Sequence, residues 1–220
     1  MDRSLRRRGY LLVVLILVAV AVFPATGCRS LLTTVVYLVK GTNIDADYDG
    51  LKEKTVVVVC RPMASLEYRD AQVAKDLARQ VGALLRANVS KINVINQNKV
   101  SEWTDVNDWT DFAEVGKGLD ADMVVGIELL GFKLRQGQTL YQGKADTIVK
   151  VVDCNDGDKI VFQRKLDQLL YPPNTGIETS TMGDAEFRRK LILVLADQVA
   201  RHFYPHDPHA DFAMDATVLD

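Results

Sequence analysis

Histidine, cysteine and the motifs of common enzyme classes are scarce or missing in this sequence. Its 220 residues include three histidines and three cysteines. They contain no G-x-S-x-G motif, no Ser-x-x-Lys pair and no phosphate-binding loop, which excludes the usual signatures of nucleophilic and nucleotide-binding enzymes. We therefore expect a protein that is not an enzyme and that uses no cofactor.

Clustered positive charge is confined to the start of the chain. The net charge is -2, and residues 1–27 contribute four arginines and one aspartate, so taking away their +3 leaves -5 for the rest. An acidic domain without a basic cluster is not expected to bind nucleic acid. The chain is 48% hydrophobic and 25% charged, which is typical of one packed globular domain.

The N-terminal residues have the pattern of an export signal. Arg3, Arg6, Arg7 and Arg8 precede an apolar run over residues 11–23, which Pro24 ends. This run is shorter than the roughly 20 apolar residues that span a bilayer. The sequence Ala25-Thr26-Gly27-Cys28 resembles the lipobox of bacterial lipoproteins, with Ala25 where leucine is usual. The resemblance implies that residues 1–27 are removed and that Cys28 carries the lipid.

Two alternatives remain for this segment: a signal that is retained as a membrane anchor, and a signal that is cleaved without lipidation. Residues 28–54 are predicted to form the tether between the anchor and the domain. Within them, residues 31–39 are apolar and rich in β-branched side chains. We expect this stretch to pack on the domain as a strand or to lie at the membrane interface.

The remaining sequence predicts one α/β (α+β) domain over residues 52–204, followed by a C-terminal tail over 205–220. The run TVVVVCRP at 55–62 is typical of a strand that is buried on both faces. Apolar residues at helical spacing follow, and Asp70 is the expected N-cap of this helix. We predict a single mixed sheet flanked by helices, in the order β-α-β-α-β-β-β-α, with the later elements near residues 92–95, 111–118, 123–134, 145–153, 160–166 and 184–203.

Three stretches of this domain resemble periplasmic lipoprotein domains. They are the VVVVC strand, the helix from Asp70 to Arg86, and the segment EVGKGLDADMVVGIELL, in which a helix closes on Gly118-Leu119-Asp120-Ala121-Asp122 before a buried strand. The hairpin KVVDCNDGDKIVFQ adds to the likeness. The group includes the curli-secretion protein CsgG, the penicillin-binding-protein activator lipoproteins and the N-terminal domain of TolB. The resemblance implies a binding or assembly module without chemistry of its own.

Few residues qualify as site candidates. Cys60 and Cys154 lie at the ends of predicted strands, where they form a disulfide or stay as free thiols. His202, His206 and His209 lie together in RHFYPHDPHAD and have the donor chemistry of a zinc or nickel site, although Pro205 and Pro208 interrupt their spacing. Trp103 and Trp109 lie in an acidic, aromatic stretch that we interpret as a partner-binding loop.

These observations predict an exported lipoprotein that faces the periplasm from the outer or the inner membrane. Its expected partners are the membrane, through the N-terminal lipid, and an envelope protein, with a homo-oligomer left open. Its expected function is a non-catalytic interaction or assembly module. The alternatives are an accessory lipoprotein of an export or transport complex, and a metal-dependent envelope enzyme that uses the three histidines.

Overall fold

The computed structural model describes residues 43–63 and 67–208. The predicted signal peptide, Cys28, the apolar stretch at 31–39 and His209 lie outside these residues. The chain divides into two units, Met1–Asn43 and Ile44–Asp220, and the described fold belongs to the second. In the part of the chain that the structure describes, no helix combines the length and the hydrophobicity that crossing a bilayer requires.

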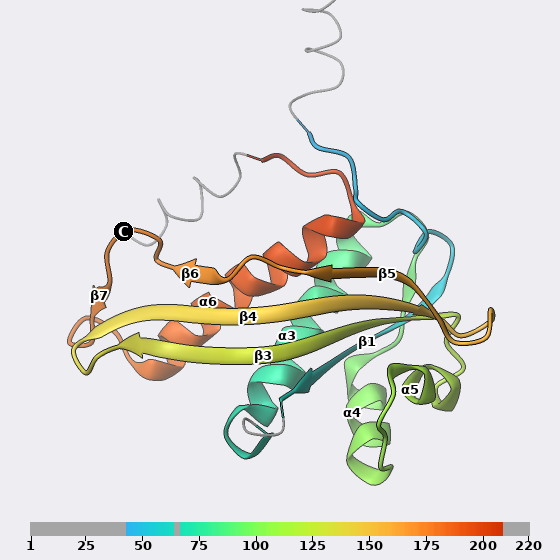
Figure 1. The fold of residues 1–220 in the computed structure, drawn as a ribbon, viewed down its shortest axis with the longest axis horizontal. Coiled ribbons are helices and arrows are strands. Elements are labelled where there is room, and N and C mark those ends of the chain that lie inside the picture. The colour runs from blue at the N-terminus through green and yellow to red at the C-terminus, as the bar shows by residue number, and fades with distance from the viewer. Residues whose placement is uncertain (1–42, 64–66, 209–220) are drawn as a thin grey trace, which may run out of the picture. The chain divides into compact units, whose positions relative to one another are not determined.

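A mixed sheet forms the centre of the fold and confirms the predicted fold class (Figure 1). Its strand order is β2-β1-β3-β4-β5, in which β1 pairs in parallel with β2 and β3 while β3, β4 and β5 are antiparallel. The strands are β1 (Thr55–Pro62), β2 (Asn93–Val94), β3 (Met123–Gln136), β4 (Leu140–Asp153) and β5 (Lys159–Lys165). Two short strands, β6 (Leu169–Tyr171) and β7 (Ile177–Glu178), pair with β4 further along its outer edge.

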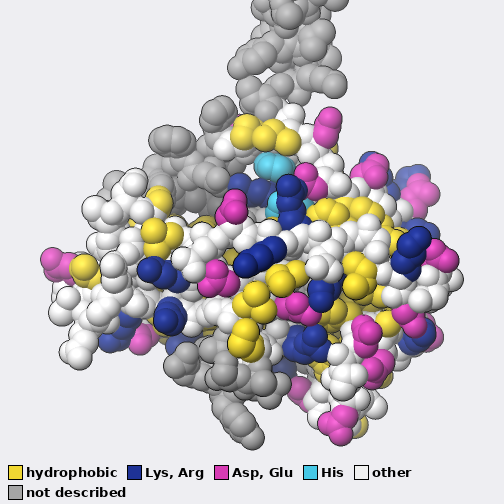
Figure 2. All heavy atoms as spheres, viewed as in Figure 1, with side chains coloured by type: hydrophobic (Ala, Val, Ile, Leu, Met, Phe, Trp, Pro, Cys, Tyr) yellow, Lys and Arg dark blue, Asp and Glu magenta, His cyan; other side chains and the backbone are white. Residues whose placement is uncertain are grey.

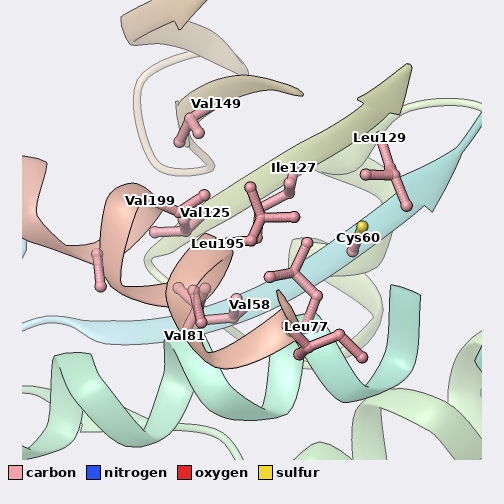
Figure 3. Packing of buried hydrophobic residues seen from close by; sticks show 14 of the residues in the cluster. Val58, Cys60, Leu77, Val81, Val125, Ile127, Leu129, Val149, Leu195 and Val199 are labelled. Atoms are coloured by element: carbon pink, nitrogen blue, oxygen red, sulfur yellow. The ribbon is translucent and has the colours of Figure 1, made fainter. Parts of the chain in front are cut away.

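Helices cover both faces of this sheet. Helices α3 (Glu67–Asn88) and α6 (Asp184–Ala200) lie on one face, behind β3 and β4 in Figure 1. They bury the larger core, in which Val58 and Ile127 contact the helical side chains around Leu77 and Leu195 (Figure 3). Helices α4 (Gln97–Val106) and α5 (Phe112–Gly118) cover the start of the opposite face through a second cluster. A 3-10 turn, η2 (Arg201–Phe203), follows α6.

Several local predictions are confirmed. The Asp111 carboxylate caps α5 by accepting a hydrogen bond from the Ala113 N–H at 3.1 Å, and Glu114 completes the capping box. The β4–β5 turn places Gly157 and Asp158 at φ of 65° and 62°, as the Asn-Asp-Gly-Asp sequence predicts. The structure adds a contact that was not predicted: the Asp122 carboxylate accepts a hydrogen bond from the Thr55 N–H at 2.8 Å, which joins the starts of β1 and β3.

Other local predictions differ from the structure. Helix α3 begins at Glu67, so Asp70 lies inside the helix and is not its N-cap. Helix α4 was not predicted, because Val100 is its one buried side chain and its sequence therefore has no apolar stripe. It begins at the N-cap Asn96, whose side chain accepts a hydrogen bond from the Asn98 N–H at 2.8 Å. Strands β6 and β7 are two further strands that the predicted order does not include.

The described end of the predicted tether packs on the domain. The backbone of Ile44 exchanges hydrogen bonds with that of His206, with N···O distances of 2.8 and 3.1 Å. Tyr48 continues the pairing by donating its N–H to the His202 carbonyl at 3.0 Å. Leu51 is fully buried in the larger core. Residues 44–51 of the predicted tether and residues 205–206 of the predicted tail therefore belong to the folded unit.

Candidate functional site

The edge of β1 that faces away from β3 is only partly paired. Strand β2 covers Thr55 and Val56, and the Ile95 N–H donates to the Val56 carbonyl at 2.9 Å where β2 ends. Strand β1 continues to Pro62. Since peptide groups alternate in direction along a strand, those of Val58 and Cys60 point to the same edge as that of Val56. Within the described residues, no strand lies beside Val58 and Cys60 on this edge.

A groove runs along this open edge, between α3 and α4. Its main cavity has a volume of about 280 Å³ and is lined on the α3 side by small residues, Ala71, Ala74 and Ala78. Ser101 and Thr104 of α4 form the facing wall, and Cys60 and Pro62 of β1 form the floor. A second cavity of about 220 Å³ continues toward Arg86, and Gln97 lines both. We call this surface the β1 groove.

An ion pair links the two helices across the β1 groove. The Lys75 ammonium of α3 contacts both carboxylate oxygens of Asp105 of α4 at 2.8 Å. The side chains of Lys75 and Asp105 are 35% and 57% exposed, so the pair is screened by water and stabilises the arrangement by at most about 1 kcal/mol. Opening this ion pair therefore costs little free energy.

The two tryptophans of the predicted binding loop have different environments. Trp103 packs over Gly118, where an added Cβ would lie 2.3 Å from the indole ring, so Trp103 acts in packing. Trp109 lines the β1 groove. The Arg61 guanidinium lies 5.8 Å from the Trp109 ring centre and 5.1 Å from that of Phe112. Trp109 alone of the two therefore reaches the groove.

Arg61 also belongs to a charged network on the sheet. Its guanidinium lies 3.2 Å from the Glu128 carboxylate, and the Lys150 ammonium contacts the same oxygen at 2.8 Å. These three side chains come from β1, β3 and β4, on the sheet face that carries α4 and α5. Hydrophobic side chains lie between basic ones over these strands in Figure 2. The network was missed because Arg61 and Glu128 are 67 positions apart in sequence.

The two described histidines hold the end of the domain together. His202 Nδ1 and the Arg164 guanidinium both contact the Asp47 carboxylate, and the His202 bond is the main cause of the lowered Asp47 pKa. The His206 ring contacts the Tyr204 carbonyl oxygen at 3.3 Å. Within residues 43–63 and 67–208, no cluster of histidine, cysteine and acidic side chains could hold a metal ion. With His209 outside the description, the three-histidine site stays a prediction.

Cys60 and Cys154 do not form a disulfide. Both thiols are free, and they lie with different cores on opposite faces of the sheet. Burial raises the pKa of the Cys60 thiol far above its usual value, and burial also raises that of Cys154. A thiol with a raised pKa is a poor nucleophile at neutral pH, because the thiolate is the reactive form. Neither thiol is poised for catalysis.

Comparison with known proteins gives distant structural likenesses. No protein-family model matches the chain, and no curated protein matches it. A PelC dodecamer structure from Paraburkholderia phytofirmans is 15% identical, with a TM-score of 0.42, covering 71% of this chain and 92% of that one. The lipoprotein GNA1162 from Neisseria meningitidis is 13% identical, with a TM-score of 0.41, covering 66% and 97%.

A third solved structure is a minor lipoprotein from Acinetobacter baumannii. It is 18% identical, with a TM-score of 0.31, and the match covers 68% of this chain and 91% of that one. Two of these three similar structures are thus named as lipoproteins. Identities and scores this low do not place the chain in a family, and the predicted resemblance to CsgG and TolB stays a prediction.

Proposed function

We propose that this protein is an exported, membrane-tethered lipoprotein that binds an envelope protein and catalyses no reaction. The observation that carries this proposal is the β1 groove. Buried or half-buried peptide groups need hydrogen-bond partners, and an extended segment of another protein supplies them by adding a strand. Cys60 and Pro62 of β1 form the floor of the groove, at the part of the edge that β2 leaves unpaired, and small side chains form its walls.

Two carboxylates of the domain have lowered pKa values because of their hydrogen-bond partners. Hydrogen bonds from the Thr55 N–H and the Asn155 amide hold the Asp122 pKa low. The Arg135 guanidinium and the Tyr141 hydroxyl hold the Asp184 pKa low. Carboxylates held in this way are fully ionised at neutral pH, whereas a general acid or base needs a pKa near the working pH. These groups stabilise the fold.

The lipid anchor gives the first prediction. Replacing Cys28 with serine removes the sulfur that receives the diacylglycerol, so the protein should move from the membrane to the soluble fraction of fractionated cells. Cys154→Ser is the matched control and should stay at the membrane, because that thiol lies in the domain. Mass spectrometry of the N-terminal peptide would show the lipid. An unmodified Cys28 on a full-length chain contradicts lipidation and favours the retained anchor.

The groove gives the second prediction. Ala71 lies on the exposed side of α3 and lines the groove, so Ala71→Trp should fill the space without disturbing the core. Ala87→Trp is the matched control, since Ala87 is exposed on the same helix and lines neither cavity. A photoreactive residue at Ser101 should capture the partner in intact cells. Capture should fall about tenfold or more with Ala71→Trp, a loss of about 1.4 kcal/mol of binding, and stay unchanged with Ala87→Trp.

Two results would count against the groove. The first is equal capture by the two tryptophan variants. The second is equal capture by the photoreactive residue placed at Ser90, which is exposed and lines neither cavity. The identity of the captured protein also distinguishes the two proposed roles, a general interaction module and an accessory subunit of a transport complex. An inner-membrane ATPase or permease as the groove-dependent adduct would assign the protein to the second class.

A further inference from the structure

The register of the sheet gathers basic side chains that are scattered in the sequence. Side chains alternate between the two faces of each strand, and paired residues share a face. The face that carries α4 and α5 therefore bears seven charged residues beyond those helices. Five are cations and two are carboxylates: Arg61, Lys133, Lys144, Lys150 and Lys165, with Glu128 and Asp146. The part of this face beyond α4 and α5 is therefore positive, on a chain whose net charge is -2.

Three of these cations have no carboxylate partner among the residues that the structure describes. Glu128 already forms ion pairs with Arg61 and Lys150. The Asp146 carboxylate accepts hydrogen bonds from the Gln168 amide, with both oxygens at 3.0 Å from the nitrogen. Within the described residues, Lys133, Lys144 and Lys165 form no ion pair. We call these three the lysine face.

Two members of the lysine face lie directly opposite each other. Lys133 of β3 pairs with Lys144 of β4 in the antiparallel register. Like charges at directly opposite positions destabilise a sheet, because their side chains are only about 5 Å apart at the Cβ atoms. Lys165 of β5 lies opposite Ile148, four residues further along β4, which is about 13 Å away. The opposition of Lys133 and Lys144 therefore gives the sheet no electrostatic stability.

We propose that the lysine face binds an extended acidic segment of a protein. This surface is separate from the β1 groove and does not depend on it. Carboxylates at every second position of an extended segment are about 7 Å apart, so two of them four residues apart can reach the Lys133–Lys144 pair and Lys165. The partly exposed Ile148, which pairs with Lys165, offers an apolar contact. A flat anionic bilayer fits less well, because an extended segment can place its carboxylates away from Asp146 and Glu128, whereas the phosphate groups of a bilayer cover the whole face.

The test uses the full chain in detergent and a fluorescent peptide of about ten alternating aspartate and serine residues, followed by anisotropy. Lys144→Glu should raise the dissociation constant about tenfold or more, and Lys144→Arg should retain binding, because the site requires charge. Lys99→Glu is the matched control, as it makes the same charge change at an exposed lysine of α4, and it should change the constant less than about twofold.

A second readout separates binding from folding. Lys144→Glu replaces a repulsive pair with an attractive one opposite Lys133, so its melting temperature should stay equal or rise while its binding falls. A lowered melting temperature of Lys144→Glu would mean that the lysines stabilise the fold, and it would overturn the proposal. So would an unchanged dissociation constant for Lys144→Glu, or undetectable binding of the peptide at low salt.

Two further experiments distinguish the acidic segment from other ligands and the lysine face from the groove. Vesicles of phosphatidylglycerol and phosphatidylcholine that bind with the same dependence on Lys144, while the peptide does not, would assign the face to lipid and overturn the proposal. Ala71→Trp should leave peptide binding intact, because it fills only the β1 groove. If Ala71→Trp abolishes peptide binding and Lys144→Glu does not, the acidic peptide binds in the β1 groove. This result would overturn the proposal for the lysine face.

Discussion

Replacing Leu51 with alanine is expected to lower the free energy of unfolding by about 2–5 kcal/mol. Leu51 lies between the predicted anchor and β1, in a stretch that the sequence suggests is a linker. In the structure its side chain is 0% exposed and contacts the larger core. The loss combines the transfer free energy of the missing methyl groups with the cavity that they leave. Denaturant unfolding followed by circular dichroism would measure it.

The control for this prediction is Ile44→Ala in the same segment. Ile44 is 50% exposed and holds its place through backbone hydrogen bonds to His206, which the substitution keeps. Its effect should stay within about 0.5 kcal/mol. If Leu51→Ala is equally mild, residues 44–51 do not belong to the cooperative unit and act as a tether in solution.

Replacing Phe187 with alanine should cost about 3–5 kcal/mol of stability. Phe187 is fully buried in the first turn of α6, where its ring stacks on that of Tyr141 with centroids 4.7 Å apart and lies 6.1 Å from the Tyr171 ring. It therefore joins α6 to β4 and β6. The loss should lower the midpoint of thermal unfolding and expose the outer end of β4 to hydrogen exchange before the rest of the sheet.

Leu193→Ala provides the matched comparison on the same helix. Leu193 is 49% exposed, so its removal creates no cavity and should change stability by less than about 0.5 kcal/mol. Equal losses for Phe187→Ala and Leu193→Ala would mean that α6 does not pack on the sheet through Phe187.

Much of the fold could be predicted because its core elements have strong local patterns. The VVVVC run predicted β1, and its valines are buried on both faces as that pattern requires. The three- and four-residue spacing of apolar residues predicted α3, in which Leu77, Val81 and Leu85 are fully buried. The Asn-Asp-Gly-Asp turn fixed the connection between β4 and β5.

The parts that escaped prediction depend on contacts between distant residues. Helix α4 is held by the neighbouring elements around Val100, and it has little periodicity of its own. The opposition of Lys133 and Lys144 follows from a shift in register between Leu129 and Gly131, which breaks the simple alternation of β3. Sequence composition could not distinguish Trp103 from Trp109, because the packing of Trp103 over Gly118 and the place of Trp109 at the groove both depend on the tertiary structure.

The candidate site was predicted only in part for the same reason. An aromatic, acidic loop was expected to bind a partner, and Trp109 does line the groove. The groove itself depends on where β2 stops, and two paired residues leave too weak a pattern to define that point. The charged network and the lysine face depend on which strands are neighbours, a property of topology that composition does not record.

The bridge between Ile44 and His206 decides how the domain responds to mechanical load. The two segments that it joins run antiparallel, so the incoming and the outgoing chain leave the folded unit side by side. A force that draws these two ends apart opens the backbone hydrogen bonds one after another, as in a zipper, and reaches the buried Leu51 only after the bonds at His206 and His202 have broken. Pulling the domain by its ends should therefore peel this strip at low force while the sheet keeps its structure.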